Sequence, residues 1–357
     1  MKLLQNARFW NGCLPVLCLL FFLVSCGSSP EEIPLEEAGP VDEYAEFEDN
    51  EPVIALPPGD GELPVSSFGE IWAYVVAGRE SALTRGLPLS DIGYFGTEID
   101  AYGKLTDVPN RRKLPAFSGR VHLVAACSSR SLTHFVLSPG SPERRTLVAD
   151  LLDAAKEYDG LQIDFEYVPQ RDGAAFLSFL AELRTGLGAK MFTIALPART
   201  KKISNDVYDY EKIKPLVDRI LVMAYDEHWS TSKPGPIASL PWCKRVADYS
   251  LNSIGGEKLI MGIPFYGRAW GDTNPSRALL YSGVEDVIND NRVAEIRREN
   301  GIPTFDYKVQ VAVKVYYEDD YSLAVRMEMY KSLGVASIGF WRLGQETSAV
   351  WNILRLE

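Results

Sequence analysis

Residues 158–167 read Tyr-Asp-Gly-Leu-Gln-Ile-Asp-Phe-Glu-Tyr, and this stretch decides the fold. Side chains alternate between the two faces of a β-strand, so Gln162, Asp164 and Glu166 share one face and the apolar residues between them share the other. In a parallel barrel the apolar face meets an outer layer of helices, which leaves the polar face inside. Ionised carboxylates inside a barrel need a partner or solvent. We therefore expect this strand to end at the open mouth, where the catalytic residues of barrels lie.

The two acids of this strand are predicted to act as a pair. They lie about 6.6 Å apart along the backbone, so each raises the proton affinity of the other. We expect the terminal acid, Glu166, to stay protonated near neutral pH as a general acid. The alternative is an edge strand with a solvated polar face, or an ion pair with a neighbouring basic residue. Apolar residues flank both acids, and no Lys or Arg lies between Glu157 and Arg171, which favours the first interpretation.

Seven further β-rich runs accompany this strand, which itself covers residues 160–166. They are residues 71–76, 92–97, 120–125, 191–196, 220–225, 259–266 and 336–341. Eight strands, mostly separated by helical crossovers, over about 290 residues predict an α/β fold, the (β/α)8 barrel. Residues 273–317 are predicted to be a small insertion between strands seven and eight. A doubly wound open sheet is the competing fold, but no Gly-rich phosphate loop follows the first run.

Two of the connecting segments carry clear helix signals. Residues 141–158 open with Ser-Pro-Glu, which is typical of a helix N-terminus. Residues 171–187 are predicted to bury one apolar stripe at helical spacing. The stripe consists of Ala174, Phe176, Phe179, Leu180 and Leu183.

The first 26 residues are predicted to be an export signal. They contain no acid, Lys2 and Arg8 provide a positive start, and an apolar run covers residues 14–24. Eleven residues are too short to cross ~30 Å of hydrocarbon as a helix. The run ends in Leu-Val-Ser before Cys26, which resembles the bacterial lipobox. We expect an exported bacterial lipoprotein, acylated at Cys26 and held at a membrane that faces the periplasm or the cell surface; an ordinary secretory signal is the alternative.

The negative charge of the chain is concentrated in the next segment. The 357 residues carry a formal net charge of −11, and residues 27–66 contain 12 acids and no Lys or Arg. Such a segment repels itself, so we expect an extended, disordered acidic tether, with an acidic binding arm as the alternative. Residues 67–357 hold 35 basic and 36 acidic residues and form the predicted barrel domain.

Composition also limits the ligands. The acidic balance argues against a non-specific nucleic-acid binder. Three His in the whole chain, with no metal-ligand spacing, give no metal site, and no cofactor is expected. Cys127 and Cys243 are expected to be free thiols, and the protein is expected to be a monomer.

Four motifs, in the same order along the chain, resemble those of the family 18 glycoside hydrolases, the chitinase family. Residues 159–166 look like the family signature DGxDxDxE, and Met-Ala-Tyr-Asp at residues 223–226 resembles its sixth-strand motif. Residues 262–268 and 338–344 resemble its seventh- and eighth-strand segments. The resemblance covers roughly residues 68 to 355.

The resemblance implies a retaining mechanism in which the 2-acetamido group of the substrate acts as the nucleophile. Glu166 would protonate the glycosidic oxygen and then activate water, and Asp164 would orient the acetamide. Tyr225 and Asp226 would hydrogen-bond the acetamide and sugar; the alternatives are a core aromatic for Tyr225 and a helix or loop cap for Asp226. Trp341 would form the floor beneath the sugar ring, with core packing as its alternative. The further substrate-binding residues that we expect are Gln162, Asp159, Tyr74, Trp229, Tyr266 and Arg268. Trp229 and Arg268 are included because they follow predicted barrel strands, and ordinary packing is their alternative.

The chain departs from the family pattern at two places in the signature. Gln162 replaces the middle Asp, so we expect an amide hydrogen bond to Asp164 and a changed pH optimum. Phe165 replaces the usual Trp. Residues 223–229 and 233–236 look more like the spore-cortex N-acetylglucosaminidase branch. The expected function is hydrolysis of β-1,4 linkages next to N-acetylglucosamine, on peptidoglycan first and chitin second. A non-catalytic, lectin-like glycan-binding lipoprotein on the same barrel is the alternative.

Overall fold

The computed structural model describes residues 63–271, 277–308 and 312–357. The expected signal with Cys26, and residues 27–62 of the expected tether, lie outside these residues. Within the described part of the chain, no helix has the length and apolar character needed to cross a membrane.

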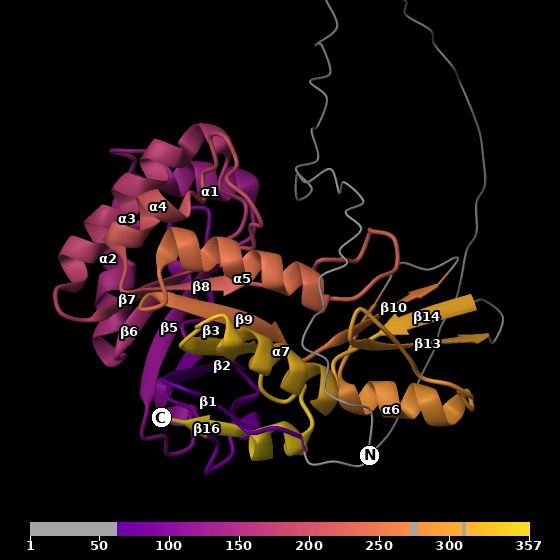
Figure 1. The fold of residues 1–357 in the computed structure, drawn as a ribbon. Coiled ribbons are helices and arrows are strands. Elements are labelled where there is room, and N and C mark those ends of the chain that lie inside the picture. The colour runs from indigo at the N-terminus through magenta and orange to yellow at the C-terminus, as the bar shows by residue number, and fades with distance from the viewer. Residues whose placement is uncertain (1–62, 272–276, 309–311) are drawn as a thin grey trace, which may run out of the picture. The chain divides into compact units, whose positions relative to one another are not determined.

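Eight parallel strands form a closed barrel, which confirms the predicted fold (Figure 1). Strand β2 pairs with β3 on one side and with β15 on the other, so the ring has no open edge. The strands in barrel order are β2 (Glu70–Val76), β3 (Asp91–Ile99), β5 (Arg120–Cys127), β6 (Gly160–Phe165), β7 (Met191–Pro197), β8 (Arg219–Met223), β9 (Leu259–Pro264) and β15 (Ser337–Trp341). Each overlaps one of the eight predicted runs.

The faces of β6 are divided as the alternation predicts. Leu161, Ile163 and Phe165 are buried in the layer between strands and helices. The ring of Phe165 stacks on Phe176 and Phe179 of helix α3, with ring centroids 6.4 and 5.7 Å apart. The polar face of β6 therefore lies inside the barrel.

Helices cover most, but not all, of the crossovers. They are α1 (Arg130–Leu137), α2 (Pro142–Ala154), α3 (Gly173–Leu187), α4 (Tyr210–Ile213), α5 (Leu240–Ile254) and α7 (Asp320–Ser332). The Ser141 hydroxyl accepts from the Arg144 N–H at the start of α2, as the Ser-Pro-Glu signal predicts. The stripe on α3 is buried except for Ala174, which is exposed.

Short elements replace α-helices in the first two crossovers. The 3-10 turn η1 (Glu80–Ala82) joins β2 to β3, and β4 (Leu105–Thr106) with η2 (Arg111–Lys113) joins β3 to β5. Further 3-10 turns are η3 (Ala155–Glu157), η4 (Gln170–Asp172), η5 (Lys214–Leu216) and η6 (Ser348–Ile353).

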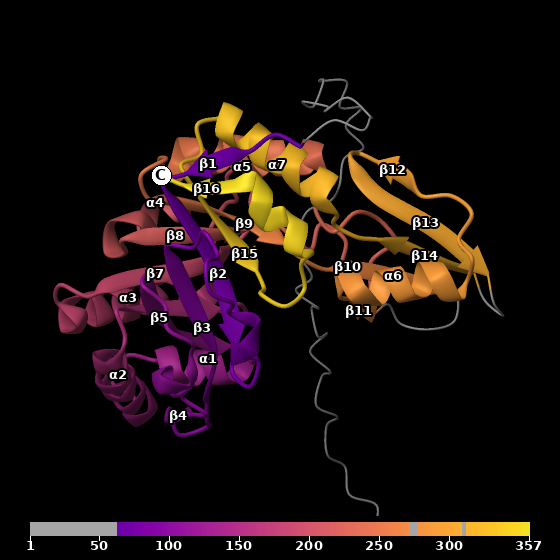
Figure 2. The same ribbon diagram turned by 90° about the horizontal axis from the view of Figure 1, so that it is seen from below.

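The insertion between the seventh and eighth barrel strands is an antiparallel sheet with one helix (Figure 2). Its strands, in sheet order, are β11 (Arg277–Leu279), β10 (Gly267–Gly271), β14 (Ala312–Tyr316), β13 (Ile302–Lys308) and β12 (Arg297–Glu299). Helix α6 (Tyr281–Asp290) packs Val284 and Val287 against the sheet. The insertion begins at Gly267, earlier than the expected residue 273, because the chain leaves the barrel after Pro264.

A small parallel ribbon joins the two ends of the barrel domain. Strand β1 (Ser66–Phe68) pairs with β16 (Leu354–Leu356), with Ser66 opposite Leu354. Ser66, the last residue of the expected tether, thus already belongs to a strand.

Candidate active site

The two acids of β6 lie where the strand ends. Asp164 is the penultimate residue of β6 and is only 7% exposed, and its Oδ1 is buried without a hydrogen-bond partner. Glu166 follows the strand and is exposed at the mouth. Burial, and then the charge of Glu166, raise the pKa of Asp164 to about 8. Burial, and then the charge of Asp226, raise the pKa of Glu166.

Asp164 holds its proton more strongly than an ordinary aspartic acid does. The reason is depth: Asp164 points into the barrel interior, where an ionised carboxylate loses most of its hydration. Burial also raises the pKa of Glu166, and the expectation that Glu166 is the general acid stays a prediction.

Gln162 lies one step deeper than Asp164 and has other partners. The Tyr74 hydroxyl donates to Gln162 Oε1 at 2.5 Å, and Gln162 Nε2 donates to Thr193 Oγ1 at 3.2 Å. The expected amide hydrogen bond to Asp164 is therefore wrong, because neighbouring strands β2 and β7 already engage both ends of the amide.

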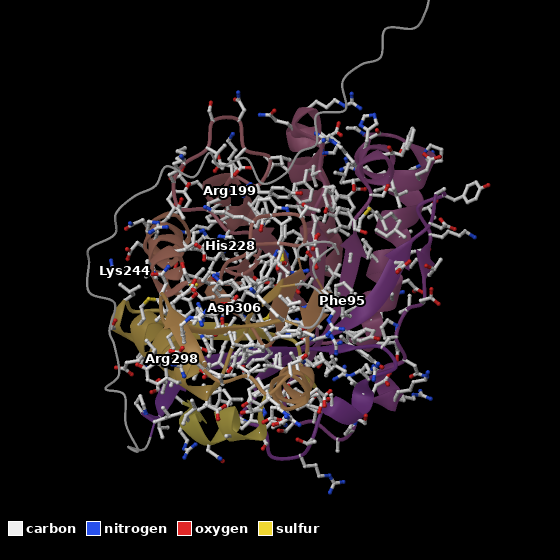
Figure 3. All side chains as sticks on the ribbon, turned by 90° about the vertical axis from the view of Figure 1, so that its right-hand side faces the viewer. Phe95, Arg199, His228, Lys244, Arg298 and Asp306 are labelled. Atoms are coloured by element: carbon white, nitrogen blue, oxygen red, sulfur yellow. The ribbon has the colours of Figure 1, made fainter. Side chains whose placement is uncertain are left out.

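Trp341 is the last residue of β15 and packs against the side chains inside the barrel. Its ring lies 5.2 Å from that of Tyr74 and 5.1 Å from that of Phe95, which is labelled in Figure 3. The indole is partly exposed, and the peptide bond to Arg342 is cis. Strand β15 lies opposite β6 in the barrel, so this aromatic cluster and the acid pair are carried by opposite sides of the ring.

A second cluster of polar side chains, Asp226, Tyr266 and Arg268, lies around the segment that follows β8. Asp226 has a positive φ of 58°, and the Tyr266 hydroxyl donates to its Oδ1 at 2.6 Å. The Arg268 guanidinium, carried by β10 of the insertion, lies 3.7 Å from the same oxygen. Burial raises the pKa of Asp226, although Tyr266 and Arg268 both act to lower it. The Tyr225 ring lies 6.4 Å from that of Tyr266.

Electrostatic contacts connect the two groups. The charges of Asp164, Asp226 and Glu166 all act to raise the pKa of Tyr225, after burial as the largest cause. Tyr225 and Trp341 also both pack against the cluster of Ile237, Tyr266, Trp270 and Tyr316. The structure therefore gathers nine of the predicted residues at the mouth: Glu166, Asp164, Tyr225, Asp226, Trp341, Gln162, Tyr74, Tyr266 and Arg268.

Among the residues that the structure describes, Asp159 and Trp229 form their hydrogen bonds and ion pairs outside this cluster. Asp159 precedes the first residue of β6 and lies at the opposite end of the barrel, where it pairs with Arg111 at 2.6 Å and accepts from the Val121 N–H. A substrate-binding role for Asp159 is therefore wrong. Trp229 lies in the loop after β8, and its indole N–H donates to Thr231 of the same loop.

The family follows from a comparison with known proteins. The sequence profile of the glycosyl hydrolases family 18 matches residues 130–346, more than half of the chain. The chain belongs to glycosyl hydrolase family 18.

Relatives of this family 18 chain include bacterial glycosylases. It is 30% identical over 225 residues to the uncharacterised glycosylase YvbX of Bacillus subtilis (strain 168), over 59% of this chain and 65% of that protein. It is 25% identical over 242 residues to the cortical fragment-lytic enzyme of Bacillus anthracis, over 63% of this chain and 56% of that protein. The matches thus span less than two thirds of the length of these relatives.

A solved structure shares the fold. The spore cortex-lytic enzyme SleL of Bacillus cereus aligns with a TM-score of 0.71 and 21% identity, over 81% of this chain and 74% of that chain. At this identity the likeness shows the fold alone.

Two aromatic residues beside the candidate site, Phe95 and Tyr316, were not anticipated from the sequence. Phe95 supports Trp341, and the alternation that located Asp164, applied to residues 92–97, would have placed it inside the barrel. Tyr316 of the insertion packs edge-on against Trp270, with no signal in the sequence.

The described residues contain no group of three or more His, Cys, Asp or Glu arranged to hold a metal ion. Each His has a local partner instead: His122 contacts Asp91, His134 contacts Asp172, and His228 contacts the Pro236 carbonyl.

Proposed function

We propose that this protein hydrolyses β-1,4 linkages next to N-acetylglucosamine with retention of configuration, using the 2-acetamido group of the substrate as nucleophile. The observation that carries the proposal is the pair of acids at the end of β6, both with a raised pKa, in a family 18 barrel. A deeply buried acid beside an exposed one suits a reaction that needs one proton donor and one charge stabiliser.

The proton of the pair gives the order of events. In the free protein, burial favours the protonated form of both acids. As the acetamide attacks the anomeric carbon, the positive charge of the forming oxazolinium favours ionised Asp164. The proton of the pair is then carried by Glu166, which donates it to the leaving glycosidic oxygen. Glu166, now a carboxylate, takes a proton from the water that opens the oxazolinium, which restores the pair.

The remaining residues hold the sugar during these steps. Trp341 offers a flat apolar surface for the C–H face of the ring that is cleaved. Tyr225 is a hydroxyl donor kept neutral by burial, and Asp226 accepts from sugar hydroxyl or amide groups. Arg268 and Tyr266 fix the Asp226 carboxylate from the side of the insertion.

Peptidoglycan is the proposed polymer, ahead of chitin. The names of the cortical fragment-lytic and spore cortex-lytic relatives support a cell-wall substrate. Arg79 and Arg342 follow the carboxyl ends of β2 and β15, which are neighbours in the barrel. Burial and then the charge of Arg79 lower the pKa of Arg342, so two cations lie close together there, with Glu346 acting in the opposite direction. Peptidoglycan carries carboxylates that chitin lacks, so this positive charge favours it.

The test is Glu166→Gln, measured on purified peptidoglycan and on chito-oligosaccharides. The variant keeps the shape of the side chain but cannot donate the proton, so turnover should fall at least about 100-fold while the unfolding midpoint stays unchanged. Glu157→Gln, at the opposite end of β6, is the matched control and should keep full activity. Undiminished hydrolysis by Glu166→Gln contradicts the mechanism. Glycan binding by the wild type without release of reducing ends indicates a lectin-like protein instead.

We also propose that the protein is exported and held at a membrane by a lipid on Cys26. The lipobox-like sequence before Cys26 and the acidic composition of residues 27–66 support this.

A further inference from the structure

The hydroxyl of Tyr208 bridges the backbone on both sides of Glu166. It donates to the Phe165 carbonyl at 2.8 Å, and it accepts from the Val168 N–H at 2.9 Å. The two backbone groups belong to the residue before Glu166 and to the second residue after it. A single phenol oxygen therefore ties the turn that carries the acid at the point where it leaves β6.

Tyr208 is itself held firmly, although it lies in the connection after β7 and not on a barrel strand. Its side chain is 6% exposed, and its N–H donates to Asp206 Oδ1 at 3.0 Å. Asp206 in turn pairs with Arg199 at 2.7 Å. The Arg199 guanidinium, labelled in Figure 3, lies 6.0 Å from the Tyr208 ring centroid. The Tyr208 ring also contacts Phe176 of α3 edge-on, at 6.1 Å.

Few other hydrogen bonds from the described part of the chain hold the backbone on either side of Glu166. Beyond β6 the backbone no longer has the strand ladder to β7, which ends with Ile163 opposite Ile194. Glu166 keeps one backbone contact, its N–H to the Cys127 carbonyl at 3.3 Å. The Tyr208 bridge therefore supplies the hydrogen bonds that fix the far side of the turn.

We propose that Tyr208 is a positioning residue that holds the Glu166 carboxylate at the height and angle needed for proton transfer. The inference rests on the proposed function, because it assigns Tyr208 to the acid that the mechanism uses. Proton transfer requires heavy atoms within hydrogen-bond reach, and a misplacement of about 1 Å costs up to about 100-fold in rate. Tyr208 does not touch the sugar in this account and acts only through the turn.

Tyr208→Phe tests the proposal, with Tyr210→Phe as a matched control. Both tyrosines are buried in the same segment, and the Tyr210 hydroxyl also donates to a backbone carbonyl, that of Pro197, at 2.6 Å. Tyr208→Phe should lower kcat about 10- to 100-fold with KM changed less than about threefold. Tyr210→Phe should keep kcat within about twofold of the wild type, although it loses a comparable hydrogen bond. Equal kcat values for the two variants overturn the proposal.

Substrates with different leaving groups distinguish a positioning role of Tyr208 from a general loss of stability. An activated aryl glycoside needs little protonation, so its hydrolysis by Tyr208→Phe should fall much less than hydrolysis of the natural linkage. An equal fall for both substrates means that Tyr208 does not act through the acid, and contradicts the proposal. If Tyr208→Phe does not fold, Asp206→Asn loosens the same side chain more gently, and it should show the same dependence on the leaving group.

Amide hydrogen exchange tests the bridge without relying on turnover. The Val168 amide should lose protection in Tyr208→Phe and keep it in Tyr210→Phe. Unchanged protection in Tyr208→Phe overturns the proposal. If Glu166→Gln retains full activity, the proposed function fails, and the exchange result still decides whether Tyr208 holds the turn.

Discussion

At the scale of single residues, Asp164, which the proposed mechanism uses, is also expected to make stability depend on pH. Its pKa is raised to about 8 in the folded protein, from an ordinary value of about 3.9. Between these two pH values the folded state holds a proton that the unfolded state has released. The free energy of unfolding should therefore fall as pH rises from about 4 to about 8, by at most about 1.4 kcal/mol per pH unit, and then level off.

Asp164→Asn removes this dependence, because the amide fills the same space and does not titrate. We expect the variant to become progressively more stable than the wild type between pH 5 and pH 8, by urea denaturation at each pH. Asp153→Asn, which replaces a carboxylate that is 78% exposed, should leave the wild-type slope unchanged. Parallel stability curves for Asp164→Asn and the wild type would show that Asp164 is already ionised in this range.

The alternation of side chains on one strand was sufficient to place Asp164 and Glu166 at the mouth, because a barrel offers only two environments to a strand. It did not exclude Asp159, although that residue belongs to the same motif. Seven residues of strand span about 23 Å, so a motif that is compact in sequence reaches both ends of the barrel. Tyr208 left no signal either, because it contacts backbone groups some 40 positions earlier.

At the scale of elements, a buried charge network joins two outer helices beside the insertion. Arg326 of α7 is fully buried and pairs with Glu318 at 2.6 Å, and it donates to Cys243 Sγ of α5 at 2.7 Å. Burial raises the pKa of Cys243 to about 11, so this thiol is neutral. Glu318 follows β14, the last strand of the insertion, so the network fixes the point where the chain returns to the barrel.

Arg326→Leu should lower the free energy of unfolding by about 3–5 kcal/mol, because it leaves the buried Glu318 carboxylate without its cationic partner and with the Ser322 hydroxyl as hydrogen-bond donor. Arg297→Leu is the control, since its partner Asp306 is half-exposed, and it should cost less than about 1 kcal/mol. Replacing both Arg326 and Glu318 by Leu should restore most of the loss. Similar losses for the two single variants would mean that the buried pair is hydrated in solution.

The barrel strands were predictable because each must bury one apolar face beneath the outer layer. The start of the insertion was not, since residues 259–266 are apolar throughout and nothing in them marks the exit after Pro264. The network of Arg326 was equally hidden, because its members are 83 and 8 positions apart and no local pattern pairs them.

At the scale of the whole molecule, charge and chemistry occupy different parts of the chain. The barrel domain, residues 67–357, carries a formal charge of only −1, while residues 27–66 carry −12. Attraction of the barrel domain to an anionic membrane is therefore weak. Under the proposed anchoring, the barrel can reach glycan at a distance from the bilayer while the lipid alone determines where the protein is held.

Cys26→Ser, expressed in a bacterial host, tests whether a lipid on Cys26 holds the protein at the membrane. The wild type should remain with membranes after a 1 M salt wash and enter the detergent phase, because a lipid, unlike a charge contact, is insensitive to screening. The variant should be found in the soluble fraction with its turnover of soluble chito-oligosaccharides within about twofold of the wild type. Cys18→Ser, which changes a thiol inside the apolar run, is the matched control and should partition like the wild type. Release of the wild type by salt, or membrane retention of Cys26→Ser, would contradict lipid anchoring at Cys26 and leave the glycosidase proposal intact.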